Sequence, residues 1–167
     1  MIGLIMCAGR SIRLKEETKD KPKCMVEVNN KPILEHIADH MNKHGIWRIV
    51  VNLHSFPEVV MKNFGQRFLY LYEPVPMGEF ATISLIRSWF PYEELIIMNG
   101  DTITNIDISE VVARKISGKC ISIETGEHMG TTVHTVGWPA HSLGVSCQYF
   151  DCGTTDGLAL ARKHYEH

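Results

Sequence analysis

Short apolar runs alternate with stretches of helical periodicity along the chain up to about residue 118. Residues 2–7 form an almost continuous apolar run, which is typical of a strand buried on both faces of a sheet. Residues 32–44 repeat apolar side chains at helical spacing, with Pro32 suited to the first turn and Gly45 to the C-terminal cap. The alternation predicts right-handed βαβ units and a mostly parallel sheet.

The same alternation continues further along the chain. Strands are expected at 47–53, 68–72 and 94–98, and helices at 55–64, 79–89 and 107–118. Ser55 and Asp107 each stand three residues before a glutamate, which is the spacing of a capping box. We therefore predict an α/β fold that is doubly wound, with the sheet in the middle of three α/β/α layers.

The last third of the chain has a weaker pattern. Strands are expected at 119–125, 131–137 and 143–150, with a closing helix at 155–165. We find no internal repeat, low-complexity tract or linker, and 167 residues is an ordinary length for one domain. Residues 1–167 are therefore predicted to form a single domain.

Composition and charge exclude several classes of protein. The chain is 44% hydrophobic and 22% charged, which argues against disorder. A formal net charge of −2 gives no general attraction to nucleic acid or to an anionic membrane, so neither is expected as a partner. The apolar N-terminal run is too short to span a membrane and has no basic segment before it. The 5 cysteines show no paired Cys-x-x-Cys spacing and are expected to be reduced thiols in a cytoplasmic protein.

In an open parallel sheet, ligands bind beyond the carboxyl ends of the strands, which directs attention to the loop that follows residues 2–7. Ala8 and Gly9 there allow close backbone approach to a phosphate, and nearby cations can neutralise it. The cations of this loop are Arg10, Arg13, Lys15, Lys19, Lys21 and Lys23. The pattern predicts a phosphate-binding loop, and the alternative is a solvated surface loop.

Two aspartates follow strand-like runs. Asp101 comes after Asn99 and Gly100, and Asp151 stands before a glycine near the end of the chain. Asp107 already provides a helix cap, which leaves Asp101 free to face a cation. Because Mg²⁺ takes one or two carboxylates together with substrate phosphates, these residues predict a magnesium site. The alternative is that each aspartate only forms a turn or a cap.

Several ordered motifs resemble those of sugar-phosphate nucleotidyltransferases and their phosphocholine and heptose-phosphate relatives. Residues 6–14, 21–25 and 29–34 are similar to that family's L-A-A-G-x-G-T-R-L, P-K-P-M and G-K-P-[IL]-L segments. Further similarity lies at 45–52, 73–78, 98–101 and 150–154. The resemblance covers residues 2–118 and about 148–165.

The resemblance implies a Rossmann-like nucleotidyltransferase fold and a reaction between an NTP and a small phosphorylated acceptor that releases pyrophosphate. Asp101 and Asp151 would hold Mg²⁺ against the α-phosphate. Arg13 would neutralise the departing pyrophosphate, and Lys23 would contact phosphate across the reacting centre. The nucleotide-binding positions would be Ala8, Gly9, Arg10, Ser11, Gly78, Asn99 and Gly100.

The chain departs from the family pattern at several positions. Ser11 and Ile12 replace Gly-Thr, Cys24 replaces a proline, and Glu79 replaces a threonine. Residues 119–147 stand in place of a much longer acceptor-binding region, so a shortened acceptor side is expected. One alternative is a non-catalytic nucleotide-binding relic of the fold. Another, a retaining glycosyltransferase relative, is disfavoured because the basic loop suits an NTP and no D-x-D pair is present.

Several other residues that could carry chemistry are expected to have structural roles instead. His36, His40 and His44 share one helical stripe opposite the apolar face, and a solvated stripe is expected rather than a zinc site. Cys7 lies within an apolar run and is expected to be a core residue. Trp89 ends a predicted helix, where an exposed patch could serve homo-oligomerisation.

Overall fold

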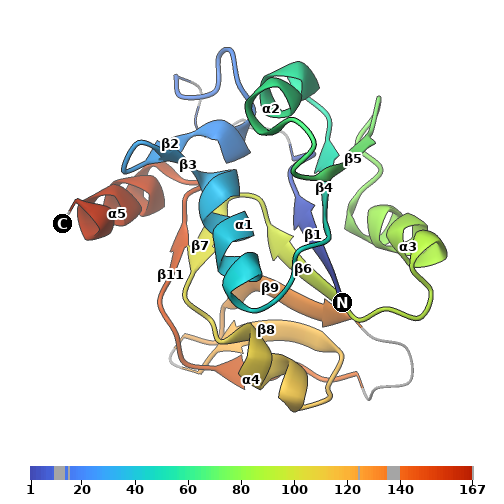
Figure 1. Ribbon diagram of the computed structural model, residues 1–167. Coiled ribbons are helices and arrows are strands. Elements are labelled where there is room, and N and C mark those ends of the chain that lie inside the picture. The colour runs from blue at the N-terminus through green and yellow to red at the C-terminus, as the bar shows by residue number, and fades with distance from the viewer. Residues whose placement is uncertain (10–13, 15, 124, 135–139, 167) are drawn as a thin grey trace.

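A seven-stranded sheet forms the centre of the protein (Figure 1). The computed structural model describes residues 1–166 apart from 10–13, 15, 124 and 135–139. The strand order is β10-β8-β9-β6-β1-β4-β5. The strands are β1 (Ile2–Met6), β4 (Ile49–Leu53), β5 (Leu69–Tyr72), β6 (Leu95–Asn99), β8 (Gly118–Ser122), β9 (His128–His134) and β10 (Leu143–Val145). β6, β1, β4 and β5 are mutually parallel, and β9 is antiparallel to both of its neighbours.

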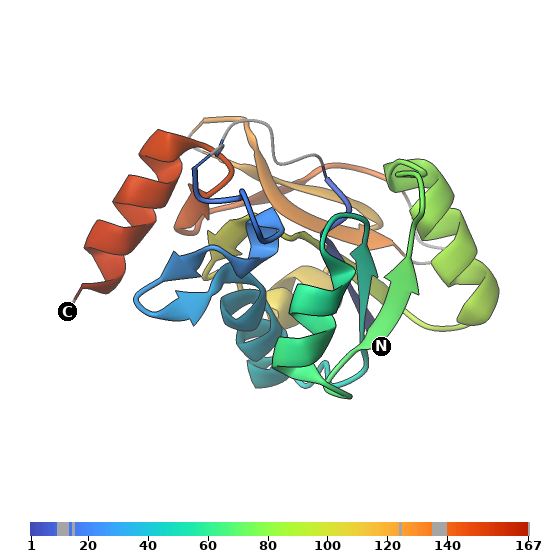
Figure 2. The same cartoon turned by 90° about the horizontal axis from the view of Figure 1, so that it is seen from above.

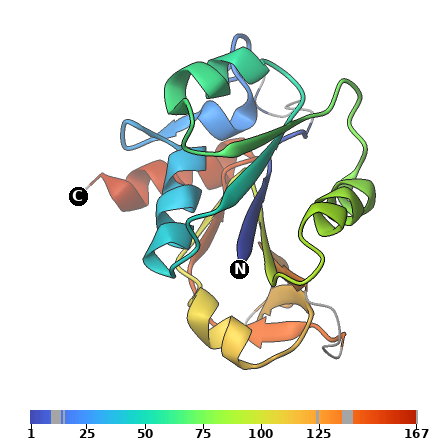
Figure 3. The same cartoon turned by 45° about the vertical axis from the view of Figure 1, so that its right-hand side comes forward.

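Helices cover both faces of the sheet. The helices are α1 (Ile33–Lys43), α2 (Pro57–Phe64), α3 (Glu79–Trp89), α4 (Ile108–Ala113) and α5 (Thr155–Tyr165). Figure 3 shows the sheet between α1 and α3, and Figure 2 shows α5 and α3 at opposite ends of the molecule. The doubly wound α/β prediction with three layers is therefore confirmed.

β1 is buried on both faces, as its apolar run predicts. Leu4 packs in a cluster with Ile86 of α3, whereas Ile5 packs in the larger cluster that contains Leu34 and Ile37 of α1. Consecutive side chains of a strand point to opposite faces, so a strand between two helical layers needs apolar residues at every position. The pairing register places the end of β1 beside the ends of β4 and β6.

Two short antiparallel ladders lie outside the main sheet. β2 (Glu27–Val28) pairs with β3 (Lys31–Pro32), and β7 (Thr102–Thr104) pairs with β11 (Tyr149–Asp151). The single strand predicted at 143–150 is therefore wrong, because β10 and β11 belong to different sheets. The short 3-10 helix η1 (Lys23–Met25) leads into β2.

The two predicted capping boxes have different outcomes. Asp107 caps α4 by accepting a hydrogen bond from the Glu110 amide over 3.0 Å, as predicted. α4 ends earlier than residue 118, because the chain at Gly118 already enters β8. The Ser55 prediction is wrong: the N-cap of α2 is Phe56, which has left-handed backbone angles and makes no side-chain cap.

The histidine stripe of α1 is not a solvated face. The Nε2 of His36 donates to the Val28 carbonyl, and the Nε2 of His40 donates to the Ile106 carbonyl, each over 2.9 Å. Burial lowers the pKa of both rings, which favours the neutral forms that make these bonds. The stripe therefore attaches α1 to β2 and to the segment before α4.

No helix among the described residues has the length and apolar character needed to cross a membrane.

Candidate active site

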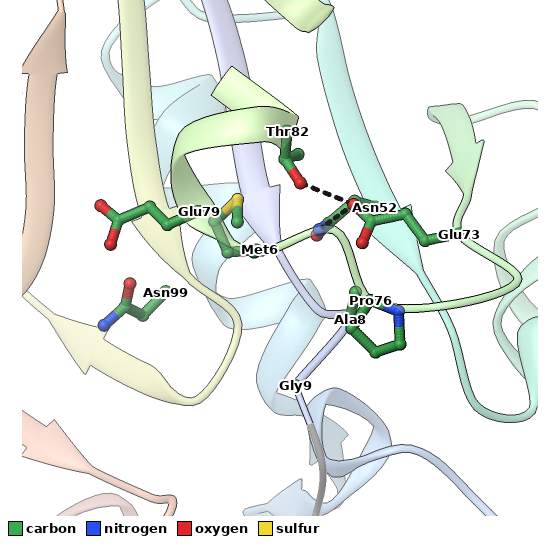
Figure 4. A pocket seen from close by; sticks show the side chains of 10 residues that line it. Met6, Ala8, Gly9, Asn52, Glu73, Pro76, Glu79, Thr82 and Asn99 are labelled. Carbon is green, nitrogen blue, oxygen red and sulfur yellow. Dashed lines mark hydrogen bonds between the residues drawn. The ribbon is translucent and has the colours of Figure 1, made fainter. Parts of the chain in front are cut away.

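A cavity of about 280 Å³ lies where β1, β4 and β6 end (Figure 4). Ala8, Gly9, Gly78 and Asn99 all line it, so four of the predicted nucleotide-binding residues come together. Gly78 has a φ of +84°, a conformation that favours glycine, and α3 begins at the next residue. The cavity therefore combines close backbone approach with the first turn of a helix, a combination suited to a nucleotide.

Gly100, another predicted nucleotide-binding residue, does not line the 280 Å³ cavity. Its amide donates to the Met6 carbonyl over 2.9 Å, and an added Cβ would lie 2.7 Å from that oxygen. Only glycine allows the chain after β6 to pass so close to β1. Gly100 lines a smaller cavity of about 50 Å³, which it shares with Lys23 and Asp101.

Three charged side chains from distant parts of the chain converge over Gly153. A Cβ built at Gly153 would lie 2.2 Å from the Lys23 Nζ, 2.7 Å from the Asp101 Oδ2 and 2.7 Å from the Asp151 Oδ1. Lys23 also forms an ion pair with Asp101. The predicted pair of aspartates and the predicted lysine therefore form one cluster, and the glycine leaves the room for it.

The ladder between β7 and β11 brings Asp151 to this cluster. Asp151 is the register partner of Thr102, which directly follows Asp101. The Gly153 amide donates to the Asp151 Oδ1 over 2.9 Å, and Thr154 caps α5 by accepting from the Gly157 amide. The turn after β11 thus orients the Asp151 carboxylate.

The two carboxylates fit a divalent cation. Mg²⁺ prefers oxygen ligands and is usually held by one or two protein carboxylates with substrate phosphates and water. No group of three or more His, Cys, Asp or Glu side chains suited to a metal occurs in the described part of the chain. Asp101 and Asp151 could therefore hold the ion only together with oxygens from a ligand or from water.

A second hollow, of about 440 Å³, lies at the two aspartates. Asp101 and Asp151 line it together with His128 of β9 and Tyr149 of β11. Asn99 lines both this hollow and the 280 Å³ cavity. The aspartates therefore line one space and Asn99 borders both, an arrangement suited to joining two substrates.

Two buried thiols near the cluster, Cys7 and Cys152, are poor nucleophiles. Burial raises the pKa of Cys7 well above its ordinary value, and burial raises the pKa of Cys152 to about 12. Both thiols are therefore protonated near neutral pH, and a thiolate is needed for nucleophilic attack. Cys7 is a core residue, as predicted.

Sequence reasoning did not identify a buried polar network at the wall of the 280 Å³ cavity (Figure 4). The Oε1 of Glu73 accepts from the Asn52 Nδ2 over 2.9 Å and from the Thr82 Oγ1 over 2.7 Å. The Oε2 accepts from the Met77 amide over 2.8 Å. Burial alone would raise the pKa of Glu73, but these three hydrogen bonds lower it below its ordinary value. Asn52 is the polar residue within the apolar strand β4, and Glu73 directly follows β5; polar residues at these two positions are the signal that could have found the network.

Three predicted site residues, Arg10, Ser11 and Arg13, lie outside the described residues. The other predicted positions fall into two groups, one around the 280 Å³ cavity and one at the charged cluster. No histidine of the α1 stripe lines either cavity.

Proteins similar to this chain in sequence include sugar-phosphate guanylyl- and uridylyltransferases. The D-glycero-alpha-D-manno-heptose 1-phosphate guanylyltransferase of Campylobacter jejuni is 34% identical over 116 residues, which cover 66% of this chain and 52% of that protein. The UTP–glucose-1-phosphate uridylyltransferase AglF of Haloferax volcanii is 29% identical over 120 residues, which cover 69% of this chain and 49% of that protein. The chain thus spans about half the length of these relatives.

Solved structures share the fold. HddC from Yersinia pseudotuberculosis, in complex with GMP-PN, superimposes with a TM-score of 0.80 at 16% identity, covering 99% of both chains. UTP-bound UGPase from Acinetobacter baumannii gives a TM-score of 0.78 at 14% identity, covering 99% of this chain and 94% of that one. The fold is therefore the Rossmann-like fold of nucleotidyltransferases. The model of the MobA-like NTP transferase domain matches residues 3–164, so the chain belongs to the family of MobA-like NTP transferase domains.

Proposed function

We propose that the protein is a Mg²⁺-dependent nucleotidyltransferase that transfers a nucleoside monophosphate from an NTP to a sugar phosphate or a similar small phosphorylated acceptor. The observation that carries the proposal is the convergence of Lys23, Asp101 and Asp151 over Gly153, with both aspartates lining the 440 Å³ hollow. The sugar-1-phosphate guanylyl- and uridylyltransferases among the relatives support the reaction class. They differ in nucleobase, so they leave the base undecided.

Each cavity receives one substrate. The nucleoside occupies the 280 Å³ cavity beside Ala8, Gly9 and Gly78, where backbone comes close to the ligand. The acceptor occupies the 440 Å³ hollow beside His128 and Tyr149. Residues 119–147, through β8, β9 and β10, supply the acceptor side in place of the longer region of the relatives. The α-phosphate then lies next to the aspartates.

The chemistry is a displacement at the α-phosphorus. A bond forms from an acceptor phosphate oxygen to the α-phosphorus, and the bond from the α-phosphorus to the bridging oxygen breaks, so the electron pair leaves with pyrophosphate. Holding the two reactants in line supplies much of the rate enhancement. Lys23 neutralises phosphate charge at the cluster, and Arg13 of the basic loop neutralises the pyrophosphate. Mg²⁺, when held by Asp101 and Asp151, supplies further charge neutralisation at the α-phosphate.

Pyrophosphate release tests the proposal. The four NTPs are crossed with a panel of sugar 1-phosphates and phosphocholine in the presence of Mg²⁺. Release that requires both an NTP and one acceptor supports the transferase. If no combination releases pyrophosphate while NTP binding is still detected by thermal shift, the result contradicts the transferase and supports a non-catalytic nucleotide-binding protein.

A further inference from the structure

We propose that the outer edge of β5 binds a second copy of this chain, so that two copies form a symmetric dimer with one continuous sheet. β5 is the last strand on its side of the main sheet, and no other strand of the described chain pairs with its outer edge. Figure 2 shows β5 at the margin of the molecule, with no helix or strand outside it. The inference concerns a surface outside the two cavities and does not depend on the proposed function.

The outer edge of β5 lacks the protection that edge strands usually have. Residues 68–72 read Phe-Leu-Tyr-Leu-Tyr and contain neither a charged residue nor a proline. β5 also pairs with β4 in an uninterrupted register, without a bulge. Natural proteins usually block an edge with lysine, proline, a bulge or a covering element, because unpaired amides and carbonyls are a template for another strand. The edge of β5 is therefore open to a partner strand.

The backbone of β5 directs two residues to this edge. The Glu73 amide donates to the Leu53 carbonyl of β4 over 2.7 Å. Because the backbone groups of a strand alternate between its two sides, Leu69 and Leu71 also direct theirs toward β4. Tyr70 and Tyr72 consequently direct their N–H and C=O groups outward. Two outward residues separated by one residue are the pattern that an antiparallel partner strand can satisfy.

A second copy of β5 matches this pattern. With a two-fold axis at Leu71, Tyr70 of each copy lies opposite Tyr72 of the other. Residues that lie directly opposite in an antiparallel ladder can exchange both of their hydrogen bonds. The two tyrosine pairs would thus use every outward amide and carbonyl of Tyr70 and Tyr72 in both copies. Such an isologous interface is closed, so it gives a dimer and leaves no edge for further addition.

Large apolar side chains are exposed along the segment that leads from β5 into α3. Tyr72 is 55% exposed, Val75 72% and Phe80 85%. Leu69 and Met77 are exposed as well. Together these five residues expose on the order of 600 Å², which is at the upper end of the largest apolar patches on monomeric proteins. A standard interface buries about 800 Å² per partner, so this segment and the paired strands suffice for a stable dimer.

The same segment has little charge with which to select a different partner. Glu73 and Glu79 are the only charged residues among residues 68–80. The Glu73 side chain is buried, and Glu79 lines the 280 Å³ cavity. An acidic or basic partner therefore finds no complementary charge along β5. A second copy presents the same uncharged surface and the same spacing of backbone groups.

Analytical ultracentrifugation of the wild-type chain tests the association at protein concentrations from about 1 to about 100 µM. We expect a species of twice the 18.9 kDa of the chain, with half-dissociation below about 10 µM. A monomer at every concentration would overturn the proposal.

A substitution at the edge tests which surface is used. Tyr72→Lys adds the kind of charge that blocks edge strands and should weaken the dimer about tenfold or more. Tyr92→Lys is the matched control, because Tyr92 is 99% exposed and precedes β6, which β1 and β4 separate from β5. Tyr92→Lys should dimerise like wild type. A folded Tyr72→Lys protein that dimerises like wild type, or equal weakening by both substitutions, would overturn the proposal.

Hydrogen exchange of the wild-type chain decides even if Tyr72→Lys does not fold. The amides of Tyr70 and Tyr72 should exchange about tenfold or more slowly above the midpoint of association than below it, because only the dimer gives them acceptors. The Leu71 amide faces β4 and should be protected at both concentrations. Rapid exchange of both tyrosine amides in a dimeric sample would place the interface elsewhere and overturn the proposal.

Discussion

Lys23 and Asp101 form an ion pair although 78 residues separate them in sequence. The lysine side chain is 17% exposed and the aspartate side chain 23% exposed. η1 supplies the lysine and the turn between β6 and β7 supplies the aspartate. The pair therefore orders a cation and an anion at the same point before any substrate is present, which avoids reorganisation during the reaction.

Replacing Lys23 by methionine should reduce turnover by about 100-fold or more, because a positioned charge next to the reacting phosphate is lost. Lys23→Arg keeps the charge and should retain more activity than the methionine variant. Steady-state pyrophosphate release by the two variants checks this expectation. Equal activity of Lys23→Met and wild type would remove the lysine from the mechanism.

Gly153→Ala should reduce turnover by about tenfold or more while the protein remains folded, since positioning errors near the chemistry are costly. The added Cβ would fall 2.7 Å from the Asp101 Oδ2 and from the Asp151 Oδ1 and would force the carboxylates apart. Gly144→Ala is the matched control, because its Cβ would meet the Ile123 side chain at an ordinary 3.4 Å. Activity assays and thermal melts of both variants test the prediction. An active Gly153→Ala protein would mean that the cluster tolerates this displacement.

Thr82→Val should lower the free energy of unfolding by about 1.5–3 kcal/mol, because it removes a hydrogen bond to a buried carboxylate at nearly constant volume. Ser84→Ala, at an exposed position of the same helix, should change it by less than about 0.5 kcal/mol. Urea denaturation of both variants gives the two values. A Thr82→Val protein as stable as the Ser84→Ala protein would show that the bond from Thr82 to Glu73 contributes little.

Stability should fall with acid partly through Glu73. Its pKa in the folded protein lies below the ordinary value of 4.5 that applies to the unfolded chain. As the pH falls below about 5, the unfolded chain binds the proton first, so the free energy of unfolding decreases until the folded carboxyl also titrates. Glu73→Gln should show a shallower loss over the same range in denaturation curves recorded at successive pH values. Parallel losses in the two proteins would contradict the assignment.

The regular elements could be predicted because their pattern is long. The α3 prediction at 79–89 and the α5 prediction at 155–165 agree with the observed bounds, since each helix repeats apolar residues over several turns. The ladder of β7 and β11 could not be predicted, because strands of three residues are too short to show a period and the pairing joins distant segments. This ladder is what places Asp151 beside Asp101.

The chemistry of the site was predictable only in part. Asp101 and Asp151 are recognisable because each follows a strand-like run and belongs to an ordered motif. Asn52, Glu73 and Thr82 were not identified, because their role depends on hydrogen bonds among three separate elements. His36 and His40 were wrongly predicted to be solvated. Their polar stripe resembles a solvent-exposed face in the sequence, and the backbone carbonyls that they bind come from distant segments.

The most direct test of the central claim compares pyrophosphate release by wild type, Asp101→Asn and Asp156→Asn, with Mg²⁺, an NTP and the best acceptor. Asp156 is an exposed residue of α5 and controls for the loss of a charge. We expect release by wild type and Asp156→Asn to need both substrates, and release by Asp101→Asn to be about 1,000-fold slower with an unchanged melting temperature. Release by a folded Asp101→Asn protein at the wild-type rate would contradict the assignment of the site.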